Sequence, residues 1–120
     1  MSKQKTREVK WGEIYYCDLG SGKGSVQSKL RPVLIIQNDT GNENGPTTVV
    51  AAISSAIKKM YMPTHIMLDR TCGLKEKSIV MLEQIRTIDK SRIREKIGEL
   101  PPELMQQIND ALLLSLGFYP

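Results

Sequence analysis

The sequence predicts a mainly β, α+β fold: a small antiparallel barrel or curled sheet followed by a C-terminal helix. Two observations support this prediction. Five short β-prone segments alternate with polar or glycine-rich connections up to residue 88, and beyond residue 100 the apolar residues recur at helical spacing. A chain of 120 residues allows one domain. We expect residues 1–8 to form a flexible tail and residues 9–120 to form that domain.

The five predicted strands are short apolar or β-branched runs bounded by turn-forming residues. They lie at residues 13–19, 31–39, 47–55, 64–68 and 78–88. A Gly/Ser/Lys-rich stretch at residues 20–30 is longer than a tight turn, and long loops in small domains are often functional. Residues 41–46 (GNENGP) and 69–77 read as turn-rich or polar connections.

A helix is predicted over residues 102–116. Its apolar stripe consists of Leu104, Ile108, Ala111, Leu112 and Leu116. Prolines precede this stripe and Gly117 follows it, as is typical of the two ends of a helix. Leu113 and Leu114 lie partly off the stripe, so we expect them to face a second copy of the chain in a homodimer.

Composition excludes several classes of protein. No stretch approaches the roughly 18 apolar residues that a membrane helix needs, and the first residues contain no apolar segment typical of a secretory signal. One His and two isolated Cys make a zinc site improbable. We therefore expect a cytoplasmic protein with no metal, cofactor or membrane association.

Positive charge is concentrated in two segments. Residues 1–31 hold seven Lys or Arg against three Asp or Glu, and residues 58–80 hold five against two, whereas residues 32–57 hold no basic residue. If the two segments are loops on one face, they would attract a polyanion. A net charge of +4 is equally compatible with an ordinary soluble protein.

Several stretches together resemble the MazF/PemK family, the toxins of bacterial type II toxin–antitoxin modules. The stretches RPVLIIQND, TTVVAAI, PTH and LEQIRTIDK occur in the family's order, and KWGEIYYCDL resembles its K-R-G-D-V-Y-x-A-D-L start. The match runs from about Lys10 to about Leu116 and is closest to the Gram-positive branch. The resemblance implies an SH3-like β-barrel (CcdB/MazF-like) with a C-terminal helix, assembled as a homodimer.

The resemblance also implies an activity and a partner. Members of the family are mRNA interferases: metal-independent, ribosome-independent endoribonucleases that cleave single-stranded RNA at short specific sequences. Their products carry a 2′,3′-cyclic phosphate and a 5′-hydroxyl. A cognate MazE-like antitoxin wraps such a toxin and blocks its RNA groove.

Two residues are the candidates for catalysis. Arg31 falls on the arginine of the family's RPV motif, and a guanidinium suits the stabilisation of a phosphorane because it presents several donors and stays charged. Because a guanidinium stays protonated, Arg31 would be a poor base, so we expect phosphorane stabilisation first and proton donation second. Ser54 aligns with a catalytic threonine of close relatives; it keeps the hydroxyl but lacks the methyl that restricts the rotamer.

Five residues are the candidates for RNA binding. Ser25 and Gln27 match a G-S-x-Q stretch in the first long loop of near relatives, and Gln84 falls on the glutamine of LEQIRT; their polar groups suit hydrogen bonds to splayed bases. Lys58 and Lys59 suit phosphate contacts, although a solvated loop explains them as well.

His65 and Glu83 have less specific interpretations. His65 is the only histidine and would be an obvious general base, but the family keeps it without a chemical role, so we interpret it as structural. Glu83 suits a pairing or substrate-reading role better than that of a base.

Two other functions remain open at this stage. A non-catalytic inhibitor similar to CcdB would use the same barrel to bind a protein target such as DNA gyrase. A plain single-stranded RNA-binding module would bind without cleaving, although the shortage of aromatic residues weighs against it.

Overall fold

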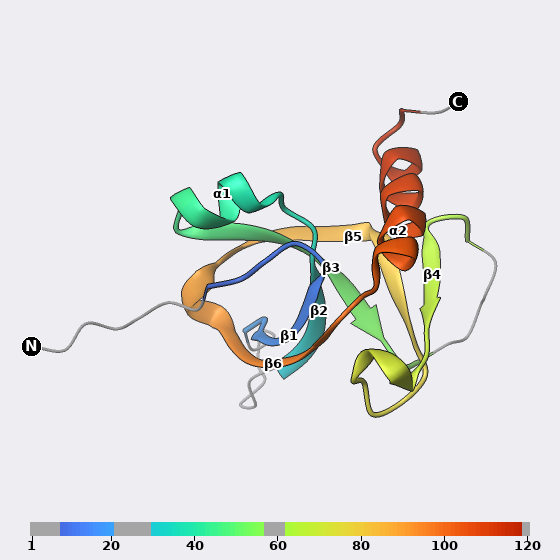
Figure 1. The fold of residues 1–120 in the computed structure, drawn as a ribbon, viewed down its shortest axis with the longest axis horizontal. Coiled ribbons are helices and arrows are strands. Elements are labelled where there is room, and N and C mark those ends of the chain that lie inside the picture. The colour runs from blue at the N-terminus through green and yellow to red at the C-terminus, as the bar shows by residue number, and fades with distance from the viewer. Residues whose placement is uncertain (1–7, 21–29, 57–61, 119–120) are drawn as a thin grey trace, which may run out of the picture.

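A computed structural model describes residues 8–20, 30–56 and 62–118 and shows a curled antiparallel sheet with a C-terminal helix (Figure 1). The strands are β1 (Glu13–Asp18), β2 (Leu30–Ile35), β3 (Thr47–Ser54), β4 (His65–Leu68), β5 (Ser78–Asp89) and β6 (Ile93–Glu99). The helices are α1 (Asp39–Asn44) and α2 (Pro102–Ser115), with short 3₁₀ turns η1 (Arg70–Cys72) and η2 (Lys90–Arg92).

The strand order across the sheet is β4-β5-β3-β2-β1-β6, and every neighbouring pair is antiparallel. The predicted fold class is confirmed. In the described part of the chain the edge strands β4 and β6 do not pair with each other, so the barrel-like sheet is curled rather than closed by a hydrogen-bonded ladder.

Two elements were not predicted from the sequence. The strand β6 was missed because its sequence, IREKIGE, is mostly charged and only Ile93 is buried, as suits an edge strand that lies half in solvent. The helix α1 occupies most of the stretch interpreted as a turn-rich connection. The Asn38 side chain caps it by accepting from the Gly41 amide, and Asn42 is buried. The predicted C-terminal helix is confirmed almost to the residue.

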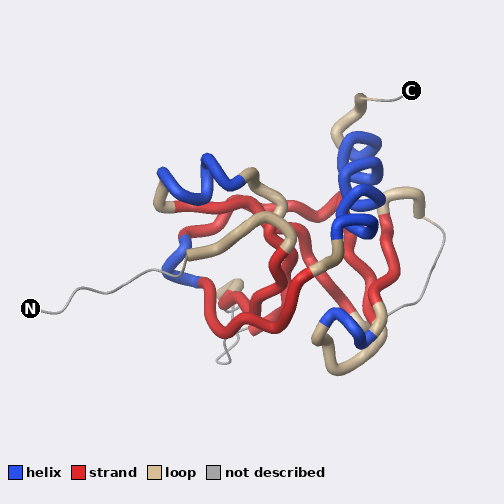
Figure 2. The backbone as a smooth tube through the Cα atoms, viewed as in Figure 1, coloured by secondary structure: helices blue, strands red, loops and turns tan. Residues whose placement is uncertain are grey.

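Two hydrophobic clusters lie on opposite faces of the sheet. Ile14, Leu34, Ala51, Val80 and Leu82 point to the face that α2 covers with Met105, Ile108 and Ala111. On the other face Tyr15, Cys17, Val33, Ile35, Val50 and Ile88 pack together under the curl of the sheet. The helix packs against β5 and β4 (Figure 2).

This arrangement leaves part of the second face uncovered. The curl fills that face near β1, β2 and the first half of β3, whereas α2 lies against the opposite face of β4 and β5. The ends of β2 and β3, with β4 and the middle of β5, therefore present side chains that neither cluster buries. We call this region the open face.

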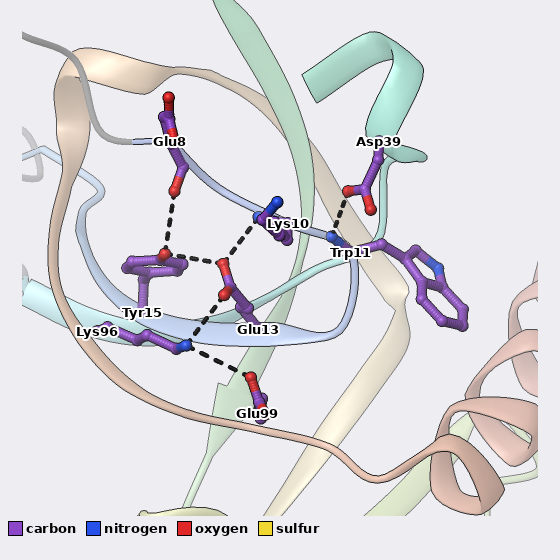
Figure 3. A network of polar contacts seen from close by, with 8 residues as sticks. All are labelled: Glu8, Lys10, Trp11, Glu13, Tyr15, Asp39, Lys96 and Glu99. Atoms are coloured by element: carbon purple, nitrogen blue, oxygen red, sulfur yellow. Dashed lines mark hydrogen bonds and ion pairs between the residues drawn. The ribbon is translucent and has the colours of Figure 1, made fainter. Parts of the chain in front are cut away.

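Polar contacts fix the start of β1 far from the open face. The Glu13 carboxylate accepts from the Tyr15 hydroxyl (2.8 Å) and the Lys10 amide (2.8 Å), and Lys96 of β6 pairs with it at 3.0 Å (Figure 3). The Trp11 amide donates to Asp39 at 2.8 Å, which ties the segment before β1 to α1. These contacts anchor β1 between β2 and the edge strand β6.

Candidate active site

The two candidate catalytic residues, Arg31 and Ser54, stand opposite each other at the ends of β2 and β3. These strands pair with Val33 opposite Ala52, Leu34 opposite Ala51 and Ile35 opposite Val50. Continuing this register by two residues beyond the pair Val33 and Ala52 places Arg31 opposite Ser54. Because alternate residues of a strand share a face, both lie on the side of Val33 and Ala52, which is the open face.

Arg31 and Ser54 also line one cavity. Its volume is about 510 Å³, and its walls come from the ends of β1, β2 and β3 and from the segment that leads into β5. The lining includes Tyr16, Leu19, Arg31, Pro32, Ser54, Ser55, Leu74, Lys75, Glu76 and Met81. The sequence-predicted catalytic pair therefore faces a concave, solvent-open space of a size that accepts a nucleotide-sized group.

The guanidinium of Arg31 is available to a ligand as far as the described residues show. The side chain is exposed, and no described residue forms an ion pair or hydrogen bond with it. Arg31 directly precedes Pro32, which also lines the cavity. The residue before a proline is restricted to an extended backbone, which limits the directions that its side chain can take. An unpaired arginine so placed is suited to an incoming phosphate.

The hydroxyl of Ser54 is oriented by the backbone that follows it. Its Oγ accepts from the Ala56 amide at 3.0 Å. Because Oγ is the acceptor in this bond, the hydroxyl proton remains available to a substrate oxygen in the cavity. The backbone contact supplies part of the orientation that a threonine would obtain from its methyl group.

Strand β5 is interrupted by a bulge next to this site. Ala52 pairs with Met81, but the preceding residue Ala51 pairs with Ile85, so residues 82–84 have no partners in β3. A bulge of this kind redirects side chains out of the ladder. Glu83 and Gln84 are both exposed there, and the Gln84 amide bonds to no described residue, which leaves it available for a base edge.

Glu83 is bound from the neighbouring strand. Thr64 donates its hydroxyl to Glu83 Oε1 at 2.7 Å, and His65 Nε2 lies 2.9 Å from Glu83 Oε2. Partial burial would raise the pKa of Glu83, but these two hydrogen bonds outweigh it and hold the pKa below its ordinary value. A carboxylate with a lowered pKa is a weaker proton acceptor, so Glu83 is poorly suited to act as a base.

His65 is equally unsuited to the role of general base. Its Nε2 is engaged by Glu83, and its Nδ1 is buried without a hydrogen-bond partner among the described residues. Neither nitrogen is free to accept a proton from a substrate hydroxyl in the cavity. The structural interpretation of His65 is therefore consistent with its contacts.

The structure also adds residues that sequence reasoning had not singled out. Tyr16 and Lys75 line the same cavity as Arg31. Lys75 belongs to the basic segment 58–80, so local charge was a usable signal, but only the fold shows that residues 69–77 reach the ends of β2 and β3. Four of the predicted RNA-binding residues, Ser25, Gln27, Lys58 and Lys59, lie outside the described residues and stay predictions.

No helix in the described ranges is long and apolar enough to cross a membrane.

Fold and site together define a class: a small curled β-barrel protein that sets an unpaired arginine and a hydroxyl at the mouth of one open cavity, a combination suited to phosphate chemistry. Residues 10–116 match the family model described as "PemK-like, MazF-like toxin of type II toxin-antitoxin system". The chain belongs to this toxin family.

Individual relatives agree with this assignment. The chain is 48% identical over 110 residues to "Endoribonuclease EndoA" of Bacillus subtilis, covering 91% of this chain and 95% of the relative. It is 45% identical over 109 residues to "Endoribonuclease MazF" of Staphylococcus saprophyticus, covering 90% and 91%. A solved structure titled "Endoribonuclease in complex with its cognate antitoxin from Mycobacterial species" matches with a TM-score of 0.78 and 27% identity, covering 93% and 99%. The expectation of a MazF-type toxin endoribonuclease is confirmed, and the inhibitor and plain binding-module alternatives are not favoured.

Proposed function

We propose that this toxin cleaves single-stranded mRNA at a short specific sequence, without a metal or the ribosome. The 2′-hydroxyl oxygen of the substrate attacks the adjacent phosphorus, and the bond from phosphorus to the 5′-oxygen breaks. The products are a 2′,3′-cyclic phosphate and a 5′-hydroxyl, so the leaving oxygen must gain a proton and the attacking hydroxyl must lose one.

One observation carries this proposal: Arg31 and Ser54 lie opposite each other across the register of β2 and β3 and line the same 510 Å³ cavity. In this reaction the main role of Arg31 is to bind the non-bridging phosphate oxygens, on which negative charge develops. Its secondary role is to donate a proton to the leaving oxygen. Ser54 donates its hydroxyl proton to a phosphate oxygen. Both roles use donor hydrogens that no residue of the described chain accepts.

Recognition of the RNA sequence is assigned to the residues around the cavity. Gln84 in the β5 bulge and Ser25 and Gln27 in the first loop would read base edges, because amides and hydroxyls both donate and accept. Lys58 and Lys59 would contact phosphates, in keeping with the positive charge of segment 58–80.

The test is RNA cleavage in EDTA by the wild-type protein and by Arg31→Ala, with the fragment ends mapped by sequencing. Arg70→Ala is the matched control, since Arg70 is also exposed but lies in η1 and does not line the cavity. We expect cuts at one short motif with 5′-hydroxyl ends in the wild type and the control, and none in Arg31→Ala. RNA binding by Arg31→Ala should stay within about tenfold of wild type, because one phosphate contact among several is lost.

Other results would change the assignment. Intact RNA that is bound by the wild-type protein would indicate a binding module, and intact, unbound RNA would indicate an inhibitor of a protein target. Normal cleavage by Arg31→Ala would show that Arg31 is not catalytic.

Two partners follow from the proposal. A cognate MazE-like antitoxin would bind this toxin in the cytoplasm, as the mycobacterial endoribonuclease is bound in the structure that this chain resembles. The chain would also form a homodimer: Leu113 and Leu114 of α2 are only half-buried, and Leu116 and Phe118 beyond them are 53% and 67% exposed. Sedimentation of the wild-type protein at micromolar concentration tests the dimer, and a monomer would contradict it.

A further inference from the structure

Glu83 combines a fixed position with unused hydrogen-bonding capacity. An ionised carboxylate has about four acceptor sites on its two oxygens. Thr64 occupies one site on Oε1 and His65 one on Oε2, at 2.7 and 2.9 Å. The remaining sites point away from these two donors, and 31% of the Glu83 side chain is exposed. The carboxylate is thus held from one side and open from the other.

The contacts of the buried His65 imidazole show which partner donates in its hydrogen bond with Glu83. Only 10% of the His65 side chain is exposed, and its buried Nδ1 has no hydrogen-bond partner in the described part of the chain. A proton on Nδ1 would be a buried donor without an acceptor, which is costly. Because an ionised carboxylate can only accept, the hydrogen of this contact lies on Nε2, and His65 donates to Glu83.

The sheet places this group on the same face as the catalytic pair. His65 of β4 is opposite Met81 of β5, which is opposite Ala52 of β3, and Ala52 is opposite Val33 of β2. Residues directly opposite in antiparallel strands share a face. Arg31 and Ser54 lie two residues beyond Val33 and Ala52 in one direction along the strands, whereas Glu83 lies two residues beyond Met81 in the other direction. The carboxylate and the catalytic pair therefore share this face but are about 13 Å apart along the strands.

A negative charge on the same face as the phosphate-binding pair requires an explanation. A carboxylate repels the RNA backbone, so at the open face it weakens binding unless it meets a donor group of the substrate. Among the bases of single-stranded RNA, adenine, cytosine and guanine carry an exocyclic amino group that donates, whereas uracil has no amino group and its one donor, N3–H, is flanked by two carbonyl oxygens. A fixed carboxylate therefore favours an amino-bearing base over uracil, whose carbonyl oxygens it repels.

We propose that Glu83 is a specificity-determining residue that accepts a hydrogen bond from the exocyclic amino group of one base of the RNA bound along the open face, and that Thr64 and His65 are positioning residues that hold its carboxylate for this contact. This inference rests on the proposed function and names a determinant of its sequence specificity. Gln84, the next residue in the bulge, remains free to contact a neighbouring group.

The test compares substrates that differ only by one amino group. Once the wild-type motif has been mapped, each of its bases is replaced in turn: adenosine by purine riboside, cytidine by zebularine and guanosine by inosine. We expect the loss of one particular amino group to lower the wild-type kcat/KM about tenfold or more, since hydrogen bonds to charged groups are the stronger ones. In Glu83→Gln the same replacement should cost much less, and uridine should be tolerated at that position.

Matched variants separate this role from a structural one. Glu43→Gln removes an exposed carboxylate on α1, away from the open face, and should keep the wild-type penalty. His65→Ala should lose most of the base discrimination, and His65→Gln, which retains a donor, should recover part of it. If Glu83→Gln is too unstable to assay, Thr64→Val removes one of the two bonds that hold the carboxylate and should halve the discrimination or more.

The outcomes are distinct. Wild-type protein that cleaves no RNA overturns the proposed function, and this inference falls with it. Wild-type cleavage at a motif that Glu83→Gln and His65→Ala leave unchanged, with only their thermal stability lowered, overturns this inference alone and shows that the three side chains merely join β4 to β5.

Discussion

Gly73 and Gly98 face each other where the segment after η1 crosses the edge strand β6. A Cβ atom on Gly98 would lie closer than 3.0 Å to the carbonyl oxygen of Cys72, and one on Gly73 would meet the carbonyl oxygen of Ile97 equally closely. The two backbones therefore touch without side chains between them. This contact brings the two ends of the curled sheet together although β4 and β6 share no ladder.

Gly98→Ala should destabilise the protein by about 1–3 kcal/mol, because the added methyl forces two backbones apart. The matched control is Gly45→Ala, whose Cβ would meet a backbone oxygen at an ordinary 3.6 Å. Thermal unfolding checks the difference: the melting temperature should fall by at least about 5 °C for Gly98→Ala and stay within a few degrees for the control. Equal melting temperatures would show that the backbones separate at little cost.

The contact between Asp39 and Trp11 predicts a pH dependence of stability. The Trp11 amide, followed by the Asn42 side chain, donates to the Asp39 carboxylate and holds its pKa below the ordinary 3.8. A group whose pKa is lowered by folding stabilises the protein above its unfolded pKa, and this stabilisation is lost as the pH falls through the folded pKa. Wild-type protein should thus exceed Asp39→Ala in unfolding free energy at pH 7, and the gap should narrow below about pH 4.

Urea unfolding of both proteins between pH 7 and pH 2 measures this gap. Asp110→Ala, on the exposed side of α2 and without a hydrogen-bond partner in the described chain, is the control and should show a small gap that is independent of pH. A constant gap for Asp39→Ala would mean that the ionised form is not the one that folding favours.

Local sequence patterns predicted most of the fold, and two elements were missed. Five strands and the C-terminal helix follow from periodicity and end signals, because their apolar residues are buried in regular patterns. The strand β6 was not predicted because edge strands need few apolar residues, and only Ile93 of its seven residues is buried. The helix α1 was not predicted because it has almost no apolar residue and depends on the capping by Asn38 and on the buried Asn42.

Local sequence patterns do not show how strands pair with one another. The family resemblance singled out Arg31 and Ser54, but only the register of β2 and β3 shows that they are opposite each other. The bulge at residues 82–84 arises from how β5 pairs with β3 and β4 at once, and it decides that Glu83 and Gln84 leave the ladder. A β-prone run with polar residues near its end does not by itself predict such a bulge.

Ser54 offers a direct test of the hydroxyl. Ser54→Ala should lower kcat by about 100-fold, the typical loss when a donor to a charged transition state is removed, with a small change in KM. Ser54→Thr keeps the hydroxyl and adds the methyl of the family's usual residue, so its kcat should equal or exceed that of the wild type. Ser55→Ala, at the neighbouring position on the same cavity wall, is the control. Comparable losses in Ser54→Ala and Ser55→Ala would assign the effect to the shape of the wall rather than to one hydroxyl.

Lys75 should contribute to RNA binding rather than to the chemical step. It lines the cavity of Arg31, is exposed and has no ion-pair partner among the described residues, whereas Lys77, two residues later, does not line the cavity. Lys75→Ala should raise KM several-fold at low salt and leave kcat nearly unchanged, because a cation near a phosphate strengthens binding of substrate and transition state alike. It should also reduce the slope of log affinity against log salt by about 0.7, the value for one phosphate contact on a single strand. Lys77→Ala removes the same charge and should change the slope less. Equal effects of the two variants would contradict a phosphate contact by Lys75. They would show that Lys75 acts only through the general positive charge of its segment.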